Sequence, residues 1–292
     1  MASPTLMFCI GATKAGTSWL HRYVAGHPQC YVRGVKELHY FDAEAFDEWA
    51  FWAADAGRHR DRCKEVAIRA SAQTADRKIR DARDAEAWCQ VIAGKKTDDA
   101  AYLGYLQDGL GAQKLIGDFT PAYGLLPAHA LRRMATLLPD VRFVFLLRDP
   151  VSRVWSHTRM MARRQCENAG DIPRQAVTLM SRILKGMEPQ IVRRSDYIGP
   201  VTRLRATVDP KQVFFGFYEE LFTQGAMARL CRFLGIDAHE ADLGRRVMEG
   251  PKVAMPPGQW TEMRDYLAPQ YDAMRDIFGK LPDAWGMEPV KV

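Results

Sequence analysis

The sequence predicts an α/β protein in which helices flank a central parallel sheet. Short apolar runs typical of buried strands recur along the chain, and helical patterns follow them after turns that carry Gly or Pro. The run 141–147 is continuously apolar apart from Arg142, which is typical of a parallel strand covered on both faces. Neither an internal repeat nor a clear linker divides the 292 residues, and we therefore expect one domain spanning residues 1–292.

The first elements form a strand, a turn and a helix. Residues 5–10 are an apolar run that we expect to be a buried strand, and the glycine-bearing turn 11–16 leads into a helix at 17–25. Residues 35–41 predict a short extended segment at the rim of a cleft. Residues 44–109, rich in Ala, Asp and Arg with Trp and Tyr at intervals, predict a helical insertion of several amphipathic helices.

The alternation of strand and helix returns after this insertion. A second strand is expected at 114–118, and the apolar run 141–147 predicts a third. Residues 213–217 supply a fourth strand. The helices that follow these strands are expected at 127–138, 151–164 and 226–234.

Composition excludes several classes of protein. With 47% hydrophobic and 26% charged residues, the chain has the ordinary make-up of a folded globular protein. No apolar run approaches the roughly 18–20 residues that a membrane span needs, and the first run is too short for a secretory signal. We therefore expect a cytoplasmic protein without stable membrane insertion. Six scattered cysteines without a C-x-x-C pair indicate reduced thiols rather than a metal site or a disulfide framework.

The charge balance favours anionic partners. Forty-one Lys and Arg against 35 Asp and Glu give a formal charge of +6. The basic clusters at 58–64, 77–83 and 159–164 alternate with acids or follow helical spacing, and we interpret them as mostly solvated helix faces. No basic strip interleaved with aromatic residues accompanies them, which disfavours nucleic acid as a partner.

The loop from Gly11 to Ser18 is suited to an anion. It lies between a predicted strand and a predicted helix, where backbone N–H groups and the positive end of the helix converge. Its glycines have the spacing of G-x-x-x-x-G-K-[ST], but Thr17 follows the second glycine and the lysine lies inside the loop as Lys14. This placement disfavours a kinase that uses a metal–nucleotide complex. The structural alternative is a glycine-rich turn with a solvated lysine.

Two motifs at strand-to-helix junctions resemble those of sulfotransferases that use 3′-phosphoadenosine 5′-phosphosulfate (PAPS). Residues 14–19 read K-x-G-T-x-W, which is similar to the loop that binds the 5′-phosphosulfate in that family. Residues 148–156 read R-D-P-x-x-R-x-x-S, which is similar to the second family motif. Shorter similarities occur at 36–41, 120–123, 195–197, 218–221, 233–235 and 267–285. The first of these looks closest to carbohydrate sulfotransferases of the heparan-sulfate type.

The resemblance implies a P-loop NTPase-like fold and a reaction that uses PAPS and releases 3′-phosphoadenosine 5′-phosphate (PAP) without a metal. It implies that Lys14 neutralises the oxygen that bridges phosphorus and sulfur. Arg148 and Ser156 are expected to bind the 3′-phosphate, whereas Arg153 is expected to be structural. The residues expected to hold the 5′-phosphate by amides or hydroxyls are Ala15, Gly16, Thr17 and Ser18.

Three further residues are expected near the donor by the same resemblance. Trp19 either stacks on the adenine or packs in the core. Tyr218 is a further candidate donor contact. Lys252 stands in Gly250-Pro251-Lys252, where the family carries a basic K-G-R loop, and is a candidate contact for a donor phosphate.

The resemblance also places a catalytic base within residues 36–41. Glu37 is the expected general base for an acceptor hydroxyl or amine, and His39 is the alternative. Phe119 stands where the heparan-type family usually has a lysine, which favours a smaller or less charged acceptor than an anionic polysaccharide. Small molecules, lipids and carbohydrates all stay open as acceptors. We expect residues 44–109 and 163–197 to cover the acceptor cleft.

Two other functions stay open at this point. A P-loop kinase or nucleotide hydrolase would turn over ATP with Mg²⁺. A non-catalytic anion-binding module would bind with strong salt dependence and perform no chemistry. Neither accounts for the ordered set of motifs, and we therefore interpret the sequence as a PAPS-dependent sulfotransferase.

Overall fold

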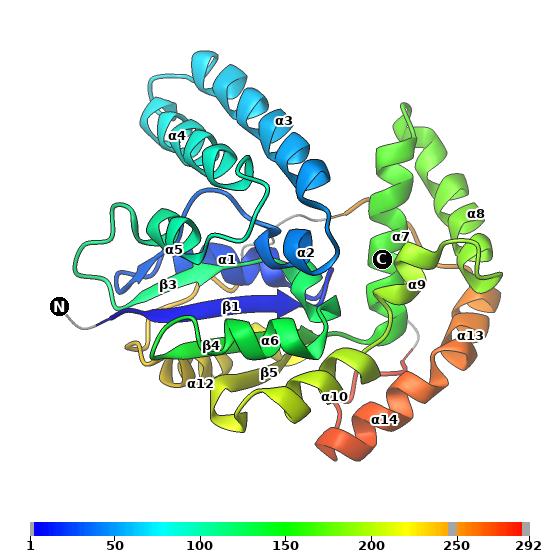
Figure 1. Cartoon of the computed structure of the whole chain (residues 1–292). Helices are drawn as coiled ribbons and strands as arrows, with labels where there is room; N and C mark the ends of the chain where they lie inside the picture. The colour runs from blue at the N-terminus through cyan, green and yellow to red at the C-terminus, as the bar shows by residue number, and fades with distance from the viewer. Residues whose placement is uncertain (1–2, 245–249, 288–292) are drawn as a thin grey trace.

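Five parallel strands form the centre of the protein in a computed structural model that describes residues 3–244 and 250–287 (Figure 1). The strand order is β2-β3-β1-β4-β5, and every neighbouring pair is parallel. The strands are β1 (Thr5–Gly11), β2 (Cys30–Tyr31), β3 (Leu115–Asp118), β4 (Val141–Leu147) and β5 (Val213–Phe217). Because the strands are parallel, their carboxyl ends meet at one edge of the sheet, and the segments that follow them can share a site.

Strand β1 occupies the middle of the sheet. Phe8 pairs with Asp118 of β3 on one side and with Phe143 of β4 on the other. The side chains from Leu6 to Ile10 are fully buried. Helices cover both faces of a parallel sheet, and this explains why the strand reads as one continuous apolar run.

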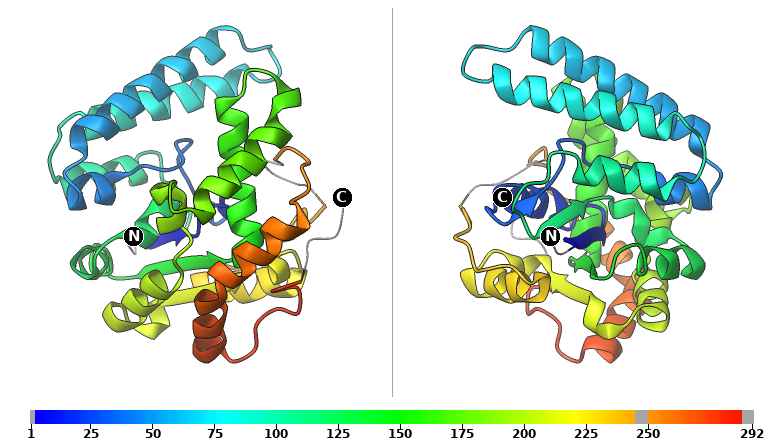
Figure 2. Two further views of the ribbon diagram at one scale, coloured as in Figure 1. Left: turned by 90° about the vertical axis from the view of Figure 1, so that its right-hand side faces the viewer. Right: turned by 60° about the vertical axis from the view of Figure 1, so that its left-hand side comes forward.

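Helices pack on both faces of the sheet (Figures 1 and 2). Helices α1 (Thr17–Ala25) and α12 (Gln224–Leu234) share one face, where the Tyr23 hydroxyl lies 3.1 Å from Cys231 Sγ. Helices α6 (Ala128–Met134) and α10 (Ile198–Thr207) lie side by side on the other face. Three short helical elements connect these strands and helices along the chain: η1 (Pro121–Leu125), η3 (Pro210–Gln212) and α11 (Tyr218–Leu221).

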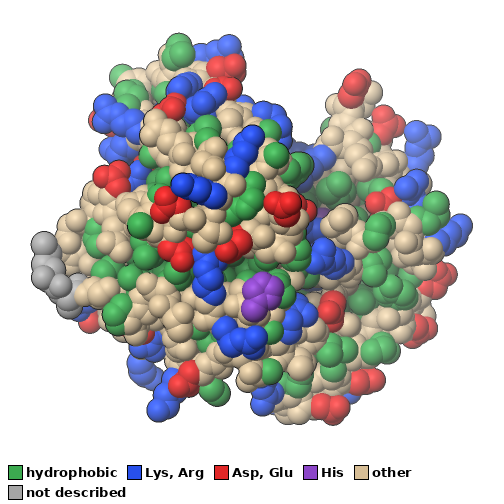
Figure 3. Space-filling model, in the orientation of Figure 1, with side chains coloured by type: hydrophobic (Ala, Val, Ile, Leu, Met, Phe, Trp, Pro, Cys, Tyr) green, Lys and Arg blue, Asp and Glu red, His purple; other side chains and the backbone are tan. Residues whose placement is uncertain are grey.

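Two further groups of helices flank a hollow that the space-filling view shows clearly (Figure 3). The first group contains α2 (Tyr40–Ala45), α3 (Trp49–Ile68), α4 (Ala75–Ile92) and α5 (Asp99–Gln107). The second group contains α7 (Pro150–Gln165), η2 (Ala169–Asp171), α8 (Ile172–Leu184), α9 (Pro189–Arg193), α13 (Pro257–Tyr266) and α14 (Ala268–Phe278). Among the helices within the described residues, none has the length and apolar character needed to cross a bilayer.

Most elements lie where the sequence predicts them. Strands β4 and β5 and helix α1 have the expected bounds, and the other predicted strands and helices differ by a few residues at their ends. The extended conformation predicted for 35–41 was wrong, because α2 starts at Tyr40 and because Glu37 (φ 67°) and His39 (φ 57°) adopt left-handed conformations. The predicted place at the rim of a cleft is confirmed, since residues 35–39 line a cavity. Strand β2 was not predicted, since two residues carry no readable periodicity.

The start of α7 is fixed by Asp149. Its Oδ1 accepts a hydrogen bond from the Ser152 amide at 2.7 Å, as a helix N-cap does, and Pro150 occupies the first turn. Its Oδ2 accepts bonds from the Tyr271 hydroxyl at 2.6 Å and from the Gly286 amide at 3.0 Å. Asp149 is 4% exposed, so one buried carboxylate joins this helix start to the C-terminal part of the chain.

Replacing Asp149 with alanine is expected to lower the free energy of unfolding by about 2–4 kcal/mol. The change removes a helix cap and leaves the buried Tyr271 hydroxyl without its acceptor. Asp98→Ala is the matched control, because Asp98 caps α5 by accepting a bond from the Ala101 amide and should cost about 1 kcal/mol. Urea unfolding followed by tryptophan fluorescence measures both losses. Equal losses would contradict the joining role of Asp149.

Candidate active site

The loop between β1 and α1 is held against the end of β4. The amide of Ala12 donates to the Leu146 carbonyl at 2.7 Å, and the amide of Ala15 donates to the Ala12 carbonyl at 3.1 Å. Lys14 (φ 70°) and Gly16 (φ 93°) are left-handed, which explains a glycine at the second position. Ala15 therefore uses its amide inside the loop. The first amides of α1 have no acceptor within the helix and can bind an anion.

Arg148 lies beside this loop, directly after β4. Its guanidinium donates to the Lys14 carbonyl at 3.2 Å and lies over the Tyr218 ring, 4.5 Å from the ring centroid. The Tyr197 hydroxyl accepts from the Arg148 amide at 3.1 Å and donates to the Arg148 carbonyl at 2.9 Å. Tyr218 also packs against Gly16, where an added Cβ would lie 3.0 Å from its ring. The two sequence motifs therefore lie directly against each other.

Helix α7 is tied to the same loop by Arg153. This side chain is fully buried, and its Nη2 donates to Ser195 Oγ at 2.6 Å. Its Nη1 donates to the Thr13 carbonyl at 3.5 Å. These contacts fit the expected structural role of Arg153. Ser156 lies one turn further along α7 and is half-buried.

Positive charge surrounds Lys14. Burial lowers the pKa of Lys14, and the charges of Arg148, Arg159, Arg164 and Lys36 lower it further. Burial and the charge of Arg148 also lower the pKa of Arg159. Every charge that shifts these two pKa values is positive. Cations held this close repel one another, so an anion bound among them relieves the repulsion.

Arg159 is a site residue that the sequence analysis missed. The interpretation of 159–164 as a mostly solvated helix face is wrong for Arg159, whose Nη1 donates to the Pro251 carbonyl at 2.9 Å. Its Nε is buried, without a hydrogen-bond partner among the described residues. Its spacing of three from Ser156 places both on one face of α7, and this spacing is the signal that could have found it.

Lys252 lies in a segment that is bound to α7. Its two neighbours in sequence accept hydrogen bonds from that helix, Pro251 from Arg159 and Val253 from the Trp155 indole at 2.9 Å. The Lys252 side chain itself is exposed. These contacts bring Lys252 to the part of α7 that carries Arg159.

Trp19 packs in the core, which was one of the two expectations for it. The indole is 6% exposed and stacks on Tyr23, with ring centroids 5.8 Å apart. Its other aromatic neighbour is Phe222, edge-on at 5.1 Å. This packing gives Trp19 a role in fixing α1 rather than a surface for the adenine.

Glu37 and His39 lie next to each other at the edge of the hollow. Lys36 Nζ is 2.6 Å from Glu37 Oε1, and His39 Nε2 is 3.9 Å from Glu37 Oε2. His39 is fixed by a 2.7 Å contact between its Nδ1 and Asp42 Oδ2. Its ring also stacks on Trp52, with centroids 3.4 Å apart. The structure therefore brings both candidate bases together.

The surroundings of Glu37 keep its carboxylate ionised. Its side chain is 47% exposed, but the walls of the hollow desolvate it in part, and this burial raises its pKa. The charge and hydrogen bond of Lys36, with smaller contributions from His39 and Arg164, outweigh burial and leave the pKa lowered. Because Arg164 belongs to α7, a positive charge on that helix helps to stabilise the Glu37 carboxylate. A carboxylate of this kind can accept a proton at neutral pH.

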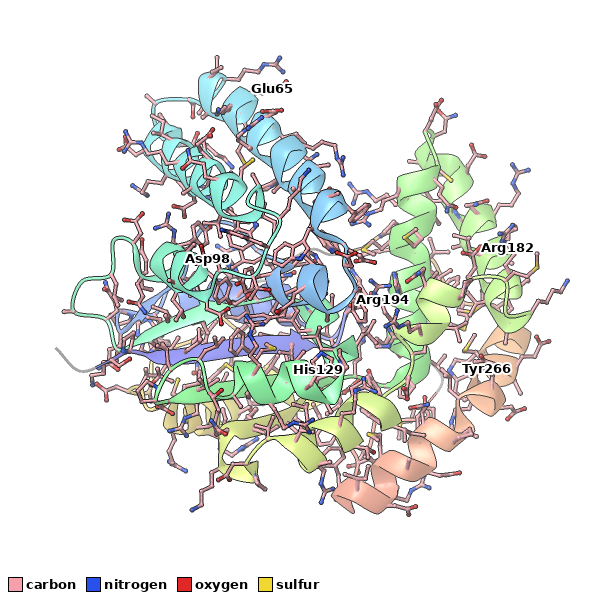
Figure 4. All side chains as sticks on the ribbon, in the orientation of Figure 1. Glu65, Asp98, His129, Arg182, Arg194 and Tyr266 are labelled. Carbon is pink, nitrogen blue, oxygen red and sulfur yellow. The ribbon has the colours of Figure 1, made fainter. Side chains whose placement is uncertain are left out.

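Arg194 lies in the hollow between α2 and α7, at the end of α9 (Figure 4). Burial and Arg193 lower the pKa of Arg194, whereas Asp42, Glu37 and Glu48 raise it. The charged form of Arg194 is therefore stabilised by carboxylates across the hollow. Carboxylates on and beside α2 therefore act on an arginine at the end of α9.

A cavity of about 160 Å³ opens beside Glu37. Its walls combine indole rings, two histidines and a second carboxylate. The lining residues are Val35, Lys36, Glu37, Leu38, His39, Trp52, Asp55, Ala56, His59, Ala85 and Trp88. A larger cavity of about 270 Å³ lies at the turn between α3 and α4 and contains none of the candidate site residues. In the described part of the chain, no three or more His, Cys, Asp or Glu side chains form a group that could hold a metal ion.

Comparisons with solved structures show the same fold in bacterial sulfotransferases. The structure is similar to a sulfotransferase from Alicyclobacillus acidocaldarius, with 20% identity, a TM-score of 0.64, and coverage of 98% of this chain and 100% of that chain. It is also similar to the sulfotransferase domain of the Synechococcus PCC 7002 olefin synthase, with 19% identity, a TM-score of 0.50, and coverage of 96% and 95%. A sulfotransferase domain from the curacin biosynthetic pathway matches with 17% identity, a TM-score of 0.50, and coverage of 89% and 83%. No curated protein sequence matches the chain significantly.

The match to a family model extends over most of the chain. A model described as the sulfotransferase family matches residues 6–240, a range that includes Lys14, Glu37 and Arg148. The parallel sheet and its flanking helices agree with the P-loop NTPase-like fold that the motifs imply. The chain therefore belongs to the sulfotransferase family.

Proposed function

We propose that this protein transfers a sulfuryl group from PAPS to a hydroxyl or amine of a small acceptor. The observation that carries the proposal is the contact between the two motifs, in which the Arg148 guanidinium donates to the Lys14 carbonyl at 3.2 Å. A donor with anionic groups at its 5′ and 3′ positions needs a cation near each group within one site, and these two motifs supply them. A loop that held a metal triphosphate would instead need its lysine after the second glycine.

The 5′ end of the donor is bound at the start of α1. The amides and hydroxyls of Thr17 and Ser18 and the amide of Gly16 hold the 5′-phosphate at the positive end of the helix. Lys14 stabilises the negative charge that builds on the bridging oxygen as its bond to sulfur breaks. Nearby cations lower the pKa of Lys14, so a bound anion would favour its charged form.

The 3′-phosphate is bound between Arg148 and the exposed face of α7. Arg148 is oriented by Tyr218 beneath its guanidinium, and Ser156 and Arg159 project from one face of the helix. Lys252 approaches the same phosphate from the segment bound to α7. Arg159 thus supplies a second guanidinium near the reduced K-G-R loop.

Glu37 removes the proton from the acceptor as the new oxygen–sulfur or nitrogen–sulfur bond forms. Lys36 and His39 hold the carboxylate in its ionised form. The cavity beside Glu37 admits a compact group rather than a polymer, and its walls come in part from the insertion 44–109. That insertion therefore sets acceptor specificity.

The donor site is tested by calorimetry with PAP and 5′-AMP, which differ in the 3′-phosphate. The wild-type protein is expected to bind PAP at least about tenfold more tightly than 5′-AMP, the range of one charge-assisted contact. Arg148→Met and Arg159→Met should each reduce this preference. Arg174→Met is the matched control, since it removes the same charge from an 87% exposed position on α8. Equal affinities of the wild type for both nucleotides would reject the PAPS assignment.

The same test continues with labelled PAPS and a panel of phenols, alcohols, amines and simple sugars. Label transfer should occur in EDTA, and Lys14→Ala should reduce it by a factor on the order of 10² to 10³ without unfolding the protein. Turnover of ATP that requires Mg²⁺, together with no label transfer, would favour a P-loop hydrolase instead.

Glu37→Gln is expected to reduce transfer by about 10²-fold or more, because the amide cannot accept the acceptor proton. His39→Gln should cost less. The lowered pKa of Glu37 predicts that titration of the base itself limits kcat/KM only below the ordinary glutamate range, so any acid limb at higher pH belongs to another group. An acid limb near pH 6.5 that disappears in His39→Gln would contradict the assignment of the base.

A further inference from the structure

The segment that carries Glu37 is held in an unusual backbone conformation. Glu37 and His39 both have left-handed φ angles, 67° and 57°, and neither is glycine or asparagine. Such residues cost on the order of 1 kcal/mol or more and persist only where surrounding contacts hold them. The segment lies outside helices and strands until α2 begins at Tyr40, so other bonds must fix it.

Three amides of this segment donate to the chain that follows β3. The Glu37 amide donates to the Phe119 carbonyl at 3.2 Å. The Leu38 amide donates to Thr120 Oγ1 at 2.9 Å, and the Tyr40 amide donates to the Tyr123 hydroxyl at 3.0 Å. Two of these three acceptors are side-chain hydroxyls. They belong to the T-P-A-Y motif at 120–123, which the donor site does not use.

The direction of these hydrogen bonds is fixed by chemistry. A backbone N–H can only donate, so the hydroxyls of Thr120 and Tyr123 must accept from it and direct their own protons elsewhere. Both hydroxyls donate to Asp118, Thr120 to Oδ1 at 2.6 Å and Tyr123 to Oδ2 at 3.0 Å. Each chain therefore runs from amide to hydroxyl to carboxylate.

Asp118 is a buried acceptor at the end of β3. It is 1% exposed and accepts a third bond, from the Tyr102 hydroxyl at 2.8 Å. Burial raises the pKa of Asp118 to about 6, although the three hydroxyl bonds act in the opposite direction. Above that pH the group is a carboxylate, which can accept all three protons. Asp118 also pairs in register with Phe8 of β1, the strand that leads to the Lys14 loop.

We propose that Asp118, acting through Thr120 and Tyr123, positions Glu37 and His39 relative to the donor loop. These three are positioning residues, because they act on the backbone of 37–40 rather than on the reacting atoms. The inference rests on the proposed function, in which Glu37 is the base. It assigns the 120–123 motif to alignment of the base and not to binding of donor or acceptor.

Tyr123→Phe and Tyr102→Phe form a matched pair that tests this role. Both tyrosines are fully buried and both donate to Asp118 Oδ2, but only Tyr123 also accepts from an amide of the segment. Tyr123→Phe is expected to lower kcat about tenfold or more, to leave the Kd for PAP within about twofold, and to accelerate amide exchange at Tyr40. Tyr102→Phe should change none of the three beyond about twofold.

Thr120 provides an independent comparison. Thr120→Val removes the hydroxyl and should lower kcat and accelerate exchange of the Leu38 amide, whereas Thr120→Ser keeps the hydroxyl and should restore both. If Thr120 were purely structural, the loss of activity in the valine and serine variants would follow their loss of stability, and kcat would not fall while the Kd for PAP stays the same.

The outcomes separate the two proposals. Equal effects of Tyr123→Phe and Tyr102→Phe on kcat, or unchanged exchange at Tyr40 in Tyr123→Phe, would overturn the positioning role. Absence of label transfer by the wild type would overturn the proposed function. Amide exchange that accelerates only in Tyr123→Phe and Thr120→Val would then still show that these hydroxyls fix residues 37–40, because the exchange measurement requires no turnover.

Discussion

The hydrogen bond between the Ala12 amide and the Leu146 carbonyl is the contact on which the meeting of the two sequence motifs depends. It holds the loop after β1 against the end of β4, and Arg148 follows that end directly. The approach is possible because residue 11 is glycine, where an added Cβ would lie 2.5 Å from the Phe145 ring. Two neighbouring parallel strands thereby bring Lys14 and Arg148 together, and the proposed site for two anionic groups follows from this pairing.

The cost of that convergence is electrostatic. Burial and the charge of Arg153, with Arg194, Lys14 and Arg164, lower the pKa of His157 to about 3, so this histidine is neutral within the cluster. The same crowding lowers the pKa of Lys14. A fold selected for stability alone has no need to gather so many cations, whereas a site for a multiply charged anion requires them. The repulsion is therefore best explained by the ligand that relieves it.

Sequence patterns predicted what depends on local order and failed where distant contacts decide. Strand β4 was readable because seven nearly continuous apolar residues permit little else. The left-handed conformations of Glu37 and His39 were not readable, because hydroxyls more than 80 residues away hold the segment. Arg159 was misread since a charge at helical spacing looks the same whether solvent or the Pro251 carbonyl faces it. Asp118 gave no signal of its own, although the motif after it did.

The two halves of the site are anchored on different strands, and this division explains how one fold can serve different acceptors. The proposed donor half is built on β1 and β4, whereas Glu37, the proposed base, is held from β3 through Asp118. The cavity walls come in part from α3 and α4, and α3 buries only Ala56 of its 20 residues. The exposed positions of such a helix can change sequence at small cost in stability. Acceptor specificity can therefore diverge in the insertion while Lys14, Arg148 and Glu37 keep their places.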